Sequence, residues 1–376
     1  MFKLAWKQFQ LNLWHSVLTT VAIGSIIAVI LLLQGFEQGQ YYQLEKIVLN
    51  RNADLIATQA GVKNFIAVRS SIPQLARSEV ESVEGVLNAH PITAIPIIYT
   101  KENKSTPVYV LVHDTFGGPS SILEGHSSIE GNYIVIDRSL AKKYDIKLGD
   151  KFNVTDFEFK VSGITKETAF MMPFAFINYD GMIDLFIESE IAPDISTFPL
   201  LSFLLIKIKP GFNVNDISKN IESTVPSVDI ITPGELAKRD VNIGRVFFGP
   251  IIGLLVTIGY IVGVLVVGLI MYADVRSHIK SFAILKALGF SFKKLLVEVL
   301  FKTLILLFFA LPIGILLAQS LTVFIQSSAP IYLIHFFNIN VIVSTVLASF
   351  GFAIIGALIP LYTIYHSDPV MAFQEV

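Results

Sequence analysis

The chain of 376 residues contains no cysteine, and it lacks the motifs of several common catalytic sites. The absence of cysteine excludes disulfide bonds, a Cys-based metal site and a Cys nucleophile. The sequence has no Gly-Lys dipeptide, which a P-loop requires, and neither an HExxH nor a GxSxG motif. These absences favour a protein that is not an enzyme and that binds no cofactor or metal of its own.

Charged residues are also scarce, at 15% of the chain, whereas hydrophobic residues make up 53%. This composition lies far outside the range of ordinary soluble domains and predicts an integral membrane protein. The formal net charge is only -2 at pH 7, and nothing in the sequence indicates a nucleic-acid partner.

Four apolar runs are each long enough to cross a bilayer as a helix, which takes about 20 residues. The last two lie in a tract without Asp, Glu, Lys or Arg at 303–367, which we divide at residues 327–340. Pro330 and Asn338 indicate a short external loop there. The predicted spans are residues 16–36, 245–273, 303–326 and 341–363.

The distribution of Lys and Arg predicts the orientation, because these residues stay on the cytoplasmic side in short loops. Residues 274–302 carry six of them, and the loop at 327–340 carries none. Moving six cations through hydrocarbon would cost on the order of 15 to 20 kcal/mol. Residues 274–302 are therefore cytoplasmic, together with an interfacial helix at 1–15 and a tail at 364–376, whereas residues 37–244 lie outside.

The external region has the pattern of a folded α+β domain. In the stretch "FEFKVSGI", Phe157, Phe159 and Val161 alternate with polar residues, as in a half-buried strand. Strands are predicted at 53–58, 91–99, 107–112, 132–136, 157–164 and 201–208, and helices at 73–83, 139–144 and 214–225. The predicted fold is an α-helical membrane protein with four transmembrane helices and a large α+β extracytoplasmic domain, of one or two lobes, between the first two helices.

Ionisable residues are missing near the middle of the predicted spans, which argues against a proton- or ion-coupled carrier. The histidines are scattered, and those of the external domain are interpreted as exposed or hydrogen-bonded rather than as metal ligands. In the second span, Gly259 and Gly263 form a small-xxx-small pattern that permits close helix packing. Two interpretations stay open for this pair: contact with a second copy, or packing within the chain.

Two stretches resemble ABC-exporter permeases of the MacB type, also called FtsX-like permeases. The first is "HIKSFAILKALGFSFKKLLVEVL", in which Leu-Lys-Ala-Leu-Gly at 285–289 precedes the return into the third span. The second is the tail "PLYTIYHSDPVMAFQEV", with Asp368 and Pro369. The stretches "NADLIATQAG" and "VESVEGV" resemble the DevC branch, whose members work with a periplasmic adaptor. Two departures are Ser281, where many members have Glu, and a less basic N-terminal helix.

The resemblance implies a permease subunit that couples ATP hydrolysis, on a separate cytoplasmic ATPase that binds ATP and Mg, to movement of its periplasmic domain. Residues 274–302 would form the coupling segment. The implied coupling residues are Phe282, Ile284, Leu285, Lys286, Leu288, Gly289, Phe290, Lys293 and Lys294, with Asp368 and Pro369 as a tail motif.

The resemblance also implies partners and a location. The expected partners are the ABC ATPase, a second copy of the chain in a homodimer, a periplasmic adaptor, an outer-membrane channel and membrane lipid. The expected location is the bacterial inner membrane. Three functions stay open: export of a substrate by mechanotransmission, lipoprotein extraction of the LolC/LolE type, and FtsX-like regulation of a cell-wall hydrolase.

Overall fold

The structure, a computed structural model, describes residues 6, 7, 9, 10, 13–66, 68–128, 130–169, 171–190, 201–360 and 365. The chain divides into two compact units. The first comprises residues 1–39, 248–328 and 334–376, and the second comprises residues 40–247 and 329–333. Much of the predicted interfacial helix and nearly all of the predicted tail, including Asp368 and Pro369, lie outside the described residues.

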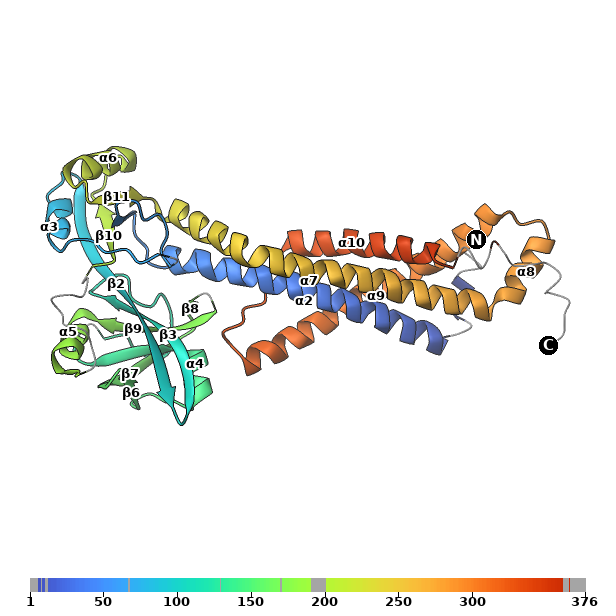
Figure 1. The fold of residues 1–376 in the computed structure, drawn as a ribbon, viewed down its shortest axis with the longest axis horizontal. Helices are drawn as coiled ribbons and strands as arrows, with labels where there is room; N and C mark the ends of the chain where they lie inside the picture. The colour runs from blue at the N-terminus through green and yellow to red at the C-terminus, as the bar shows by residue number, and fades with distance from the viewer. Residues whose placement is uncertain are drawn as a thin grey trace. The chain divides into compact units, whose positions relative to one another are not determined.

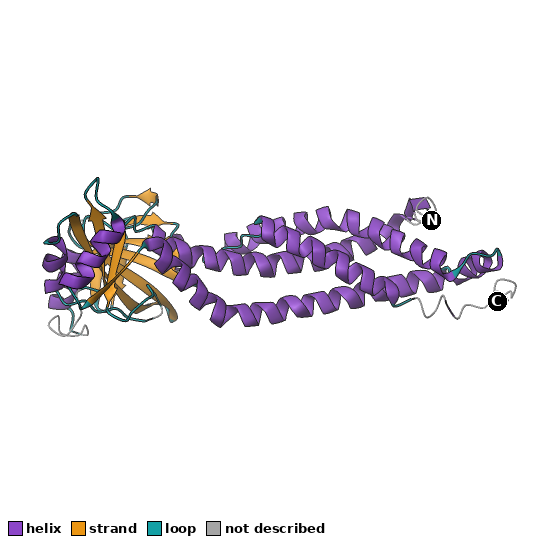
Figure 2. Ribbon diagram, turned by 90° about the horizontal axis from the view of Figure 1, so that it is seen from above, coloured by secondary structure: helices purple, strands orange, loops and turns teal. Residues whose placement is uncertain are grey.

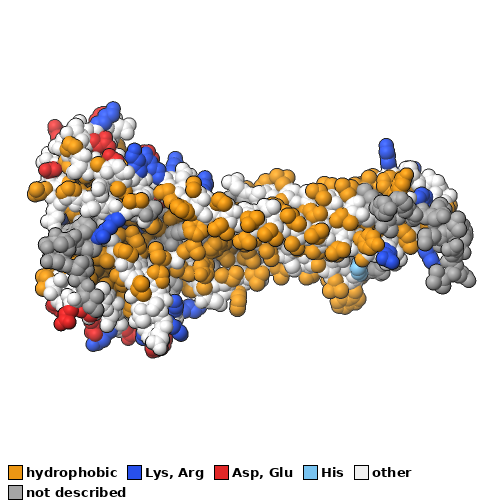
Figure 3. Space-filling model, in the orientation of Figure 1, with side chains coloured by type: hydrophobic (Ala, Val, Ile, Leu, Met, Phe, Trp, Pro, Cys, Tyr) orange, Lys and Arg blue, Asp and Glu red, His pale blue; other side chains and the backbone are white. Residues whose placement is uncertain are grey.

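Long apolar helices build the first unit, and Figures 1 and 2 show them running alongside one another. Among the described residues, four helices have the length and composition to cross a membrane: α2 (Leu13–Leu49), α7 (Pro233–Ser277), α9 (Phe292–Ser328) and α10 (Ile339–Leu358). Hydrophobic side chains cover the visible face of these helices in Figure 3. The four transmembrane helices of the predicted fold class are thus confirmed.

All four helices contribute to one apolar core, for example through Ile27, Val267, Leu306 and Phe352. Helices α2 and α9 approach closely at a pair of glycines. A Cβ atom added to Gly314 would lie 2.9 Å from the carbonyl oxygen of residue 24, which is also a glycine. Larger residues would separate the two backbones, as expected where small residues mediate packing of membrane helices.

Gln34 connects three helices through hydrogen bonds of its side-chain amide. The amide nitrogen donates to the Tyr260 hydroxyl of α7 over 2.9 Å. The amide oxygen accepts from the hydroxyls of Ser344 and Thr345 on α10, over 3.0 and 3.1 Å. Because no water is available in hydrocarbon, such internal bonds are needed to satisfy a polar side chain there.

The second unit contains one mixed sheet of 11 strands among the described residues. The sheet order is β11-β1-β10-β2-β3-β9-β5-β7-β4, with β6 paired to β7 and β8 paired to β9. The strands are β1 (Leu55–Gln59), β2 (Val86–Lys101), β3 (Lys104–His113), β4 (Ile122–Gly125), β5 (Tyr133–Asp137), β6 (Lys151–Val154), β7 (Phe157–Thr165), β8 (Thr168–Ala169), β9 (Met172–Asn178), β10 (Phe203–Ile208) and β11 (Val228–Ile231).

Helices cover the sheet in two lobes, which Figure 1 shows one above the other. The α3–α6 lobe contains β11, β1 and β10 with α3 (Leu75–Glu81) and α6 (Val214–Thr224). The α4–α5 lobe contains β3, β5, β7 and β9 with α4 (Arg138–Tyr144) and α5 (Tyr179–Glu188). These lobes form the predicted α+β domain between the first two membrane helices.

Strand β2 connects the two lobes. Its first half pairs with β10, through residues 86–92, and its second half pairs with β3, through residues 92–101. The side chains of Val86, Ile92 and Ile95 belong to three different hydrophobic clusters. One strand therefore contributes to every core of the second unit.

Candidate functional site

The predicted coupling segment contains a short helix, α8 (Ile279–Ala287), followed by a tight turn. Gly289 has a φ of +86°, a left-handed conformation that glycine adopts without strain. Its amide donates to the Lys286 carbonyl over 3.1 Å, and the amide of Phe290 donates to the Leu285 carbonyl over 3.1 Å. This pair of bonds is the Schellman arrangement that ends a helix. The glycine of the Leu-Lys-Ala-Leu-Gly motif therefore has a structural role, because its left-handed conformation ends α8.

The apolar side chains of this segment divide between an inward and an outward face. Phe282 is only 4% exposed and belongs to the core of the first unit, and Leu285 and Phe290 pack against the same core. Phe282 is thus buried within the first unit, and its predicted part in coupling stays a prediction. Ile284 and Leu288, by contrast, are 48% and 71% exposed.

The predicted rim lysines lie on two different helices rather than on one. Lys286 belongs to α8, and its ammonium group donates to the Tyr365 carbonyl over 3.0 Å. Because α8 ends at Ala287, Lys293 and Lys294 lie on the next helix, in the first turn of α9. Both side chains are exposed. The lysines thus lie on either side of the turn at Gly289.

A buried ion pair, which the sequence did not predict, joins α7 to α9 near this segment. The Lys302 ammonium group lies 2.6 Å from both carboxylate oxygens of Asp274. The side chains are 11% and 8% exposed. His278, one turn after Asp274, lies 3.6 Å from the same carboxylate. Lys302 therefore connects two long helices, in addition to being one of the six cations on which the predicted orientation rests.

The two glycines of the second span face helices of the same chain. A Cβ atom on Gly259 would lie 3.2 Å from the Ile30 side chain of α2, and one on Gly263 would lie 3.1 Å from the Phe352 ring of α10. These contacts correspond to packing within the chain, the second of the two interpretations. Contact between two copies at these glycines stays a prediction.

In the second unit, Arg51 is buried at the end of α2 and ion-paired with Glu167. Its guanidinium group also donates to the carbonyl oxygens of Gly117 and Gly118, and lies 5.4 Å from the centre of the Phe176 ring. Burial lowers the pKa of Arg51, and the carboxylate of Glu167 opposes this effect. The arginine thus fastens the loop before β4 to the end of α2.

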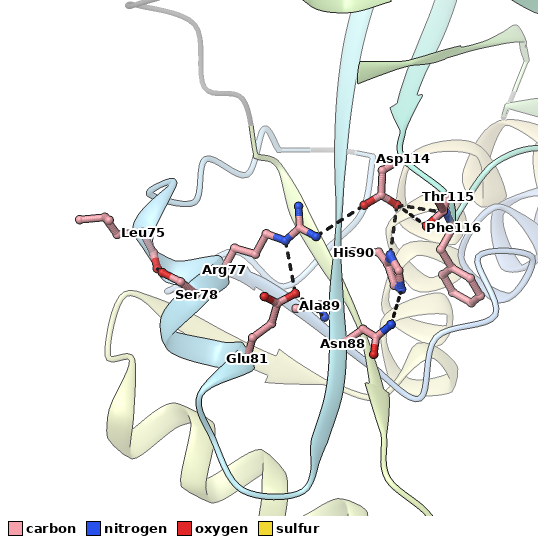
Figure 4. Close-up of polar contacts among 10 residues, drawn as sticks. All are labelled: Leu75, Arg77, Ser78, Glu81, Asn88, Ala89, His90, Asp114, Thr115 and Phe116. Carbon is pink, nitrogen blue, oxygen red and sulfur yellow. Dashed lines mark hydrogen bonds and ion pairs between the residues drawn. The ribbon is translucent and has the colours of Figure 1, made fainter. Parts of the chain in front are cut away.

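A second polar network, shown in Figure 4, surrounds Asp114 at the end of β3. The Asp114 carboxylate lies 3.1 Å from the His90 ring and 3.7 Å from the Arg77 guanidinium group. Arg77 also contacts Glu81, which accepts from the Ala89 amide over 3.1 Å. These bonds hold α3 against β2 and leave His90 engaged within the protein. Among the described residues, no three His, Asp or Glu side chains gather as a metal site.

Asp137 is a buried carboxylate at the start of α4, where it accepts a hydrogen bond from the amide of Ser139. Burial raises the pKa of Asp137 to about 7, and the hydrogen bonds from Ser139 oppose this rise. In the unfolded chain the carboxyl group ionises near 3.8. Folding therefore favours the protonated form between these two values.

We expect the stabilising effect of protonated Asp137 to be complete below pH 4 and to disappear as the pH rises through about 7. The rise in the pKa of Asp137 from 3.8 to about 7 corresponds to about 4 kcal/mol. The measurement compares heat denaturation of the wild type and the Asp137→Asn variant from pH 4 to pH 8. The wild type should gain stability relative to the variant as the pH falls, and parallel curves would contradict the prediction.

Comparison with known proteins identifies two matching family models. The model of the MacB-like periplasmic core domain matches residues 17–224, and the model of the FtsX-like permease C-terminal domain matches residues 253–369. Together they include α9, α10, most of α2, the second half of α7 and the lobes of the second unit apart from β11.

Similar curated proteins are uncharacterized ABC transporter permeases of mycobacteria. One from Mycobacterium tuberculosis is 21% identical over 308 residues, which cover 81% of each chain. One from Mycobacterium bovis is 19% identical over 360 residues, which cover 95% of each chain.

Similar solved structures include two external domains. The periplasmic region of MacB from Actinobacillus actinomycetemcomitans is 13% identical, with a TM-score of 0.35, and the match covers 50% of this chain and 94% of that one. The extracellular domain of the noncanonic ABC-type transporter YknZ from Gram-positive bacteria is 11% identical, with a TM-score of 0.36, over 48% of this chain and 100% of that one.

Proposed function

The chain belongs to the ABC transporter permeases that combine a MacB-like periplasmic core domain with an FtsX-like C-terminal domain, and from this membership we propose that it couples ATP hydrolysis on a partner subunit to movement of its external lobes. It is a multi-pass membrane protein. In the proposal, both termini and α8 lie in the cytoplasm, and the second unit lies outside.

The exposed apolar pair Ile284 and Leu288 carries the proposal. These side chains are 48% and 71% exposed at the end of a helix whose opposite face packs on the core of the membrane helices. Anchors of this kind contribute most of the energy of a protein interface when a partner buries them, and charged residues surround them at the rim. Lys293 and Lys294 lie in the next helix and supply such a rim.

The contacts of α8 support transmission of movement from an ATPase to the long helices. Leu285 and Phe290 pack against the same core as the four long helices, so a force applied to α8 reaches that core through direct contact. The buried pair of Asp274 and Lys302 resists separation of α7 from α9. We infer that these contacts let the helices respond as a group when an ATPase moves α8.

The test is purification of the tagged full-length chain from its native membranes, with assay of Mg-ATP hydrolysis and identification of the accompanying subunits. We expect an ABC ATPase to accompany the wild-type chain. In the Leu288→Asp variant, the rate of Mg-ATP hydrolysis by the purified material should fall by a factor of roughly ten or more. A charge on a side chain that the partner buries costs several kcal/mol.

The Leu87→Asp variant is the matched control, because it makes the same substitution at a leucine that is 55% exposed in the second unit. It should keep the activity of the wild type. Equal losses in the two variants, or ATP hydrolysis by the chain without any companion, would contradict the proposal.

Export through a periplasmic adaptor is the specific activity that we propose, and depletion of the chain distinguishes it from the two alternatives. Loss of export of a substrate, with normal cell division and normally sorted lipoproteins, is the expected result. Lipid-modified proteins that accumulate in the inner membrane would instead indicate extraction. A division defect without an export defect would indicate control of a cell-wall hydrolase.

A further inference from the structure

A cavity of about 480 Å³ opens in the second unit beside the end of α2. Its walls come from α2, from the loop before β4, from the connection of β7 to β8, and from residues between α9 and α10. The lining includes three cations that lie far apart in the sequence: Lys46, Arg138 and Lys166. All lining residues belong to the second unit.

The charge of this lining is positive. Among the described residues, the salt bridges within 4.0 Å do not involve Lys46, Arg138 or Lys166. The described lining has one acidic residue, Glu167, whose carboxylate is bound by Arg51 and by the amide of Ser120. Three cations therefore share a concave site in which the single carboxylate is already neutralised.

The lining also has an apolar part, formed by Ile47, Phe174, Pro330 and Leu333. Arginine and lysine bind phosphate oxygens through charge-assisted hydrogen bonds, and arginine presents two donors to one phosphate. Apolar side chains next to such cations suit the carbon atoms that adjoin a phosphate ester. The combination fits an amphiphile with a negative headgroup better than a purely inorganic ion.

Short stretches of chain connect the lining of the cavity to the membrane helices. Lys46 follows the end of the first predicted span by about ten residues, which corresponds to roughly 15 Å of helix. Pro330 and Leu333 lie in the short connection between the membrane helices α9 and α10. In the orientation of the proposed function, on which this inference rests, this connection lies on the outer side of the membrane, where lipid headgroups are found.

From these observations we propose that the cavity binds the phosphate headgroup of an anionic membrane phospholipid. Lys46, Arg138 and Lys166 contact the phosphate, and the apolar wall contacts the glycerol and the first acyl carbons. The site is separate from α8, and binding of lipid requires no ATPase.

Native mass spectrometry of the purified full-length chain tests this site, with phosphatidylglycerol and phosphatidylcholine added in turn. We expect the wild type to prefer phosphatidylglycerol. In the variant Lys46→Gln/Arg138→Gln/Lys166→Gln, the affinity for phosphatidylglycerol relative to phosphatidylcholine should fall roughly 100-fold, since each cation usually contributes about 1 kcal/mol to binding of anionic lipid. The control variant Lys142→Gln/Lys147→Gln/Lys160→Gln removes three exposed lysines of the same unit that do not line the cavity, and it should bind like the wild type.

Inorganic phosphate identifies the source of the ligand. Phosphatidylglycerol that stays bound in millimolar phosphate supports a lipid site, whereas full displacement by phosphate would overturn the lipid assignment in favour of a soluble phosphate ligand. Equal binding by the wild type and the cavity variant, or equal losses in the cavity variant and the control, would overturn the site itself. Heat denaturation of each variant checks that the fold is intact.

Discussion

The Lys302→Met variant is expected to lose about 3 to 5 kcal/mol of the free energy of unfolding, because it removes the ammonium group that lies 2.6 Å from the buried carboxylate of Asp274 and leaves only His278, 3.6 Å away, beside it. The Asp274 side chain is only 8% exposed, so water cannot replace the lost partner. Heating of the purified full chain, followed by size-exclusion chromatography, should show the midpoint of denaturation lowered by roughly 10 °C.

The double variant Asp274→Leu/Lys302→Met separates this effect from the loss of lysine packing. The double variant removes the carboxylate of Asp274 together with the ammonium group of Lys302, and such replacements of a buried pair are often neutral or stabilising. The double variant should therefore be more stable than Lys302→Met alone. Glu235→Ala is the control on α7, since its ion pair with Arg239 is solvent-exposed and contributes less than about 1 kcal/mol. A double variant as unstable as the single one would contradict the interpretation.

The Glu167→Ala variant should destabilise the second unit by a similar amount, about 3 to 5 kcal/mol, because Arg51 would stay buried without its carboxylate. The loop at Gly117 and Gly118 would lose an anchor on α2 at the same time. Limited proteolysis of the full-length chain should then cleave the residues between β3 and β5 faster than in the wild type.

The Glu158→Ala variant is the matched control for this experiment. Glu158 pairs with Lys151 over 2.8 Å, but the two side chains are 49% and 75% exposed. Exposed pairs contribute little, so the control should be cleaved at the rate of the wild type. If Glu167→Ala is cleaved no faster than Glu158→Ala, then the buried pair is not an anchor of this loop.

Much of the fold could be predicted from hydrophobic periodicity alone. The strands at 91–99 and 157–164 lie within β2 and β7, and the first three predicted spans lie within α2, α7 and α9. The fourth, at 341–363, begins within α10 but was predicted to extend beyond the end of this helix at Leu358. Strand β9 was missed, since Pro173 interrupts its apolar run and a proline usually argues against an internal strand. Its ladder partners, β3 and β5, are separated from it in sequence and become evident only in three dimensions.

The sequence could not show which of the candidate coupling residues are buried and which are exposed. A helix of nine residues such as α8 presents too few turns for periodicity to tell the buried face from the exposed one. Phe282 and Ile284 are equally apolar, and only packing places the first inside and the second outside. Lys302 and Asp274 are 28 residues apart, so the sequence could not show that they meet.

Strand β2 has a consequence for how the external lobes fold. Side chains alternate between the two faces of a strand, so a slip of one residue would turn every inward side chain of β2 outward. Because Val86, Ile92 and Ile95 belong to three separate clusters, such a slip would remove side chains from the hydrophobic cores of both lobes. The pairing of β2 with β10 is thus linked to its pairing with β3 at Ile92, which is paired with both neighbours.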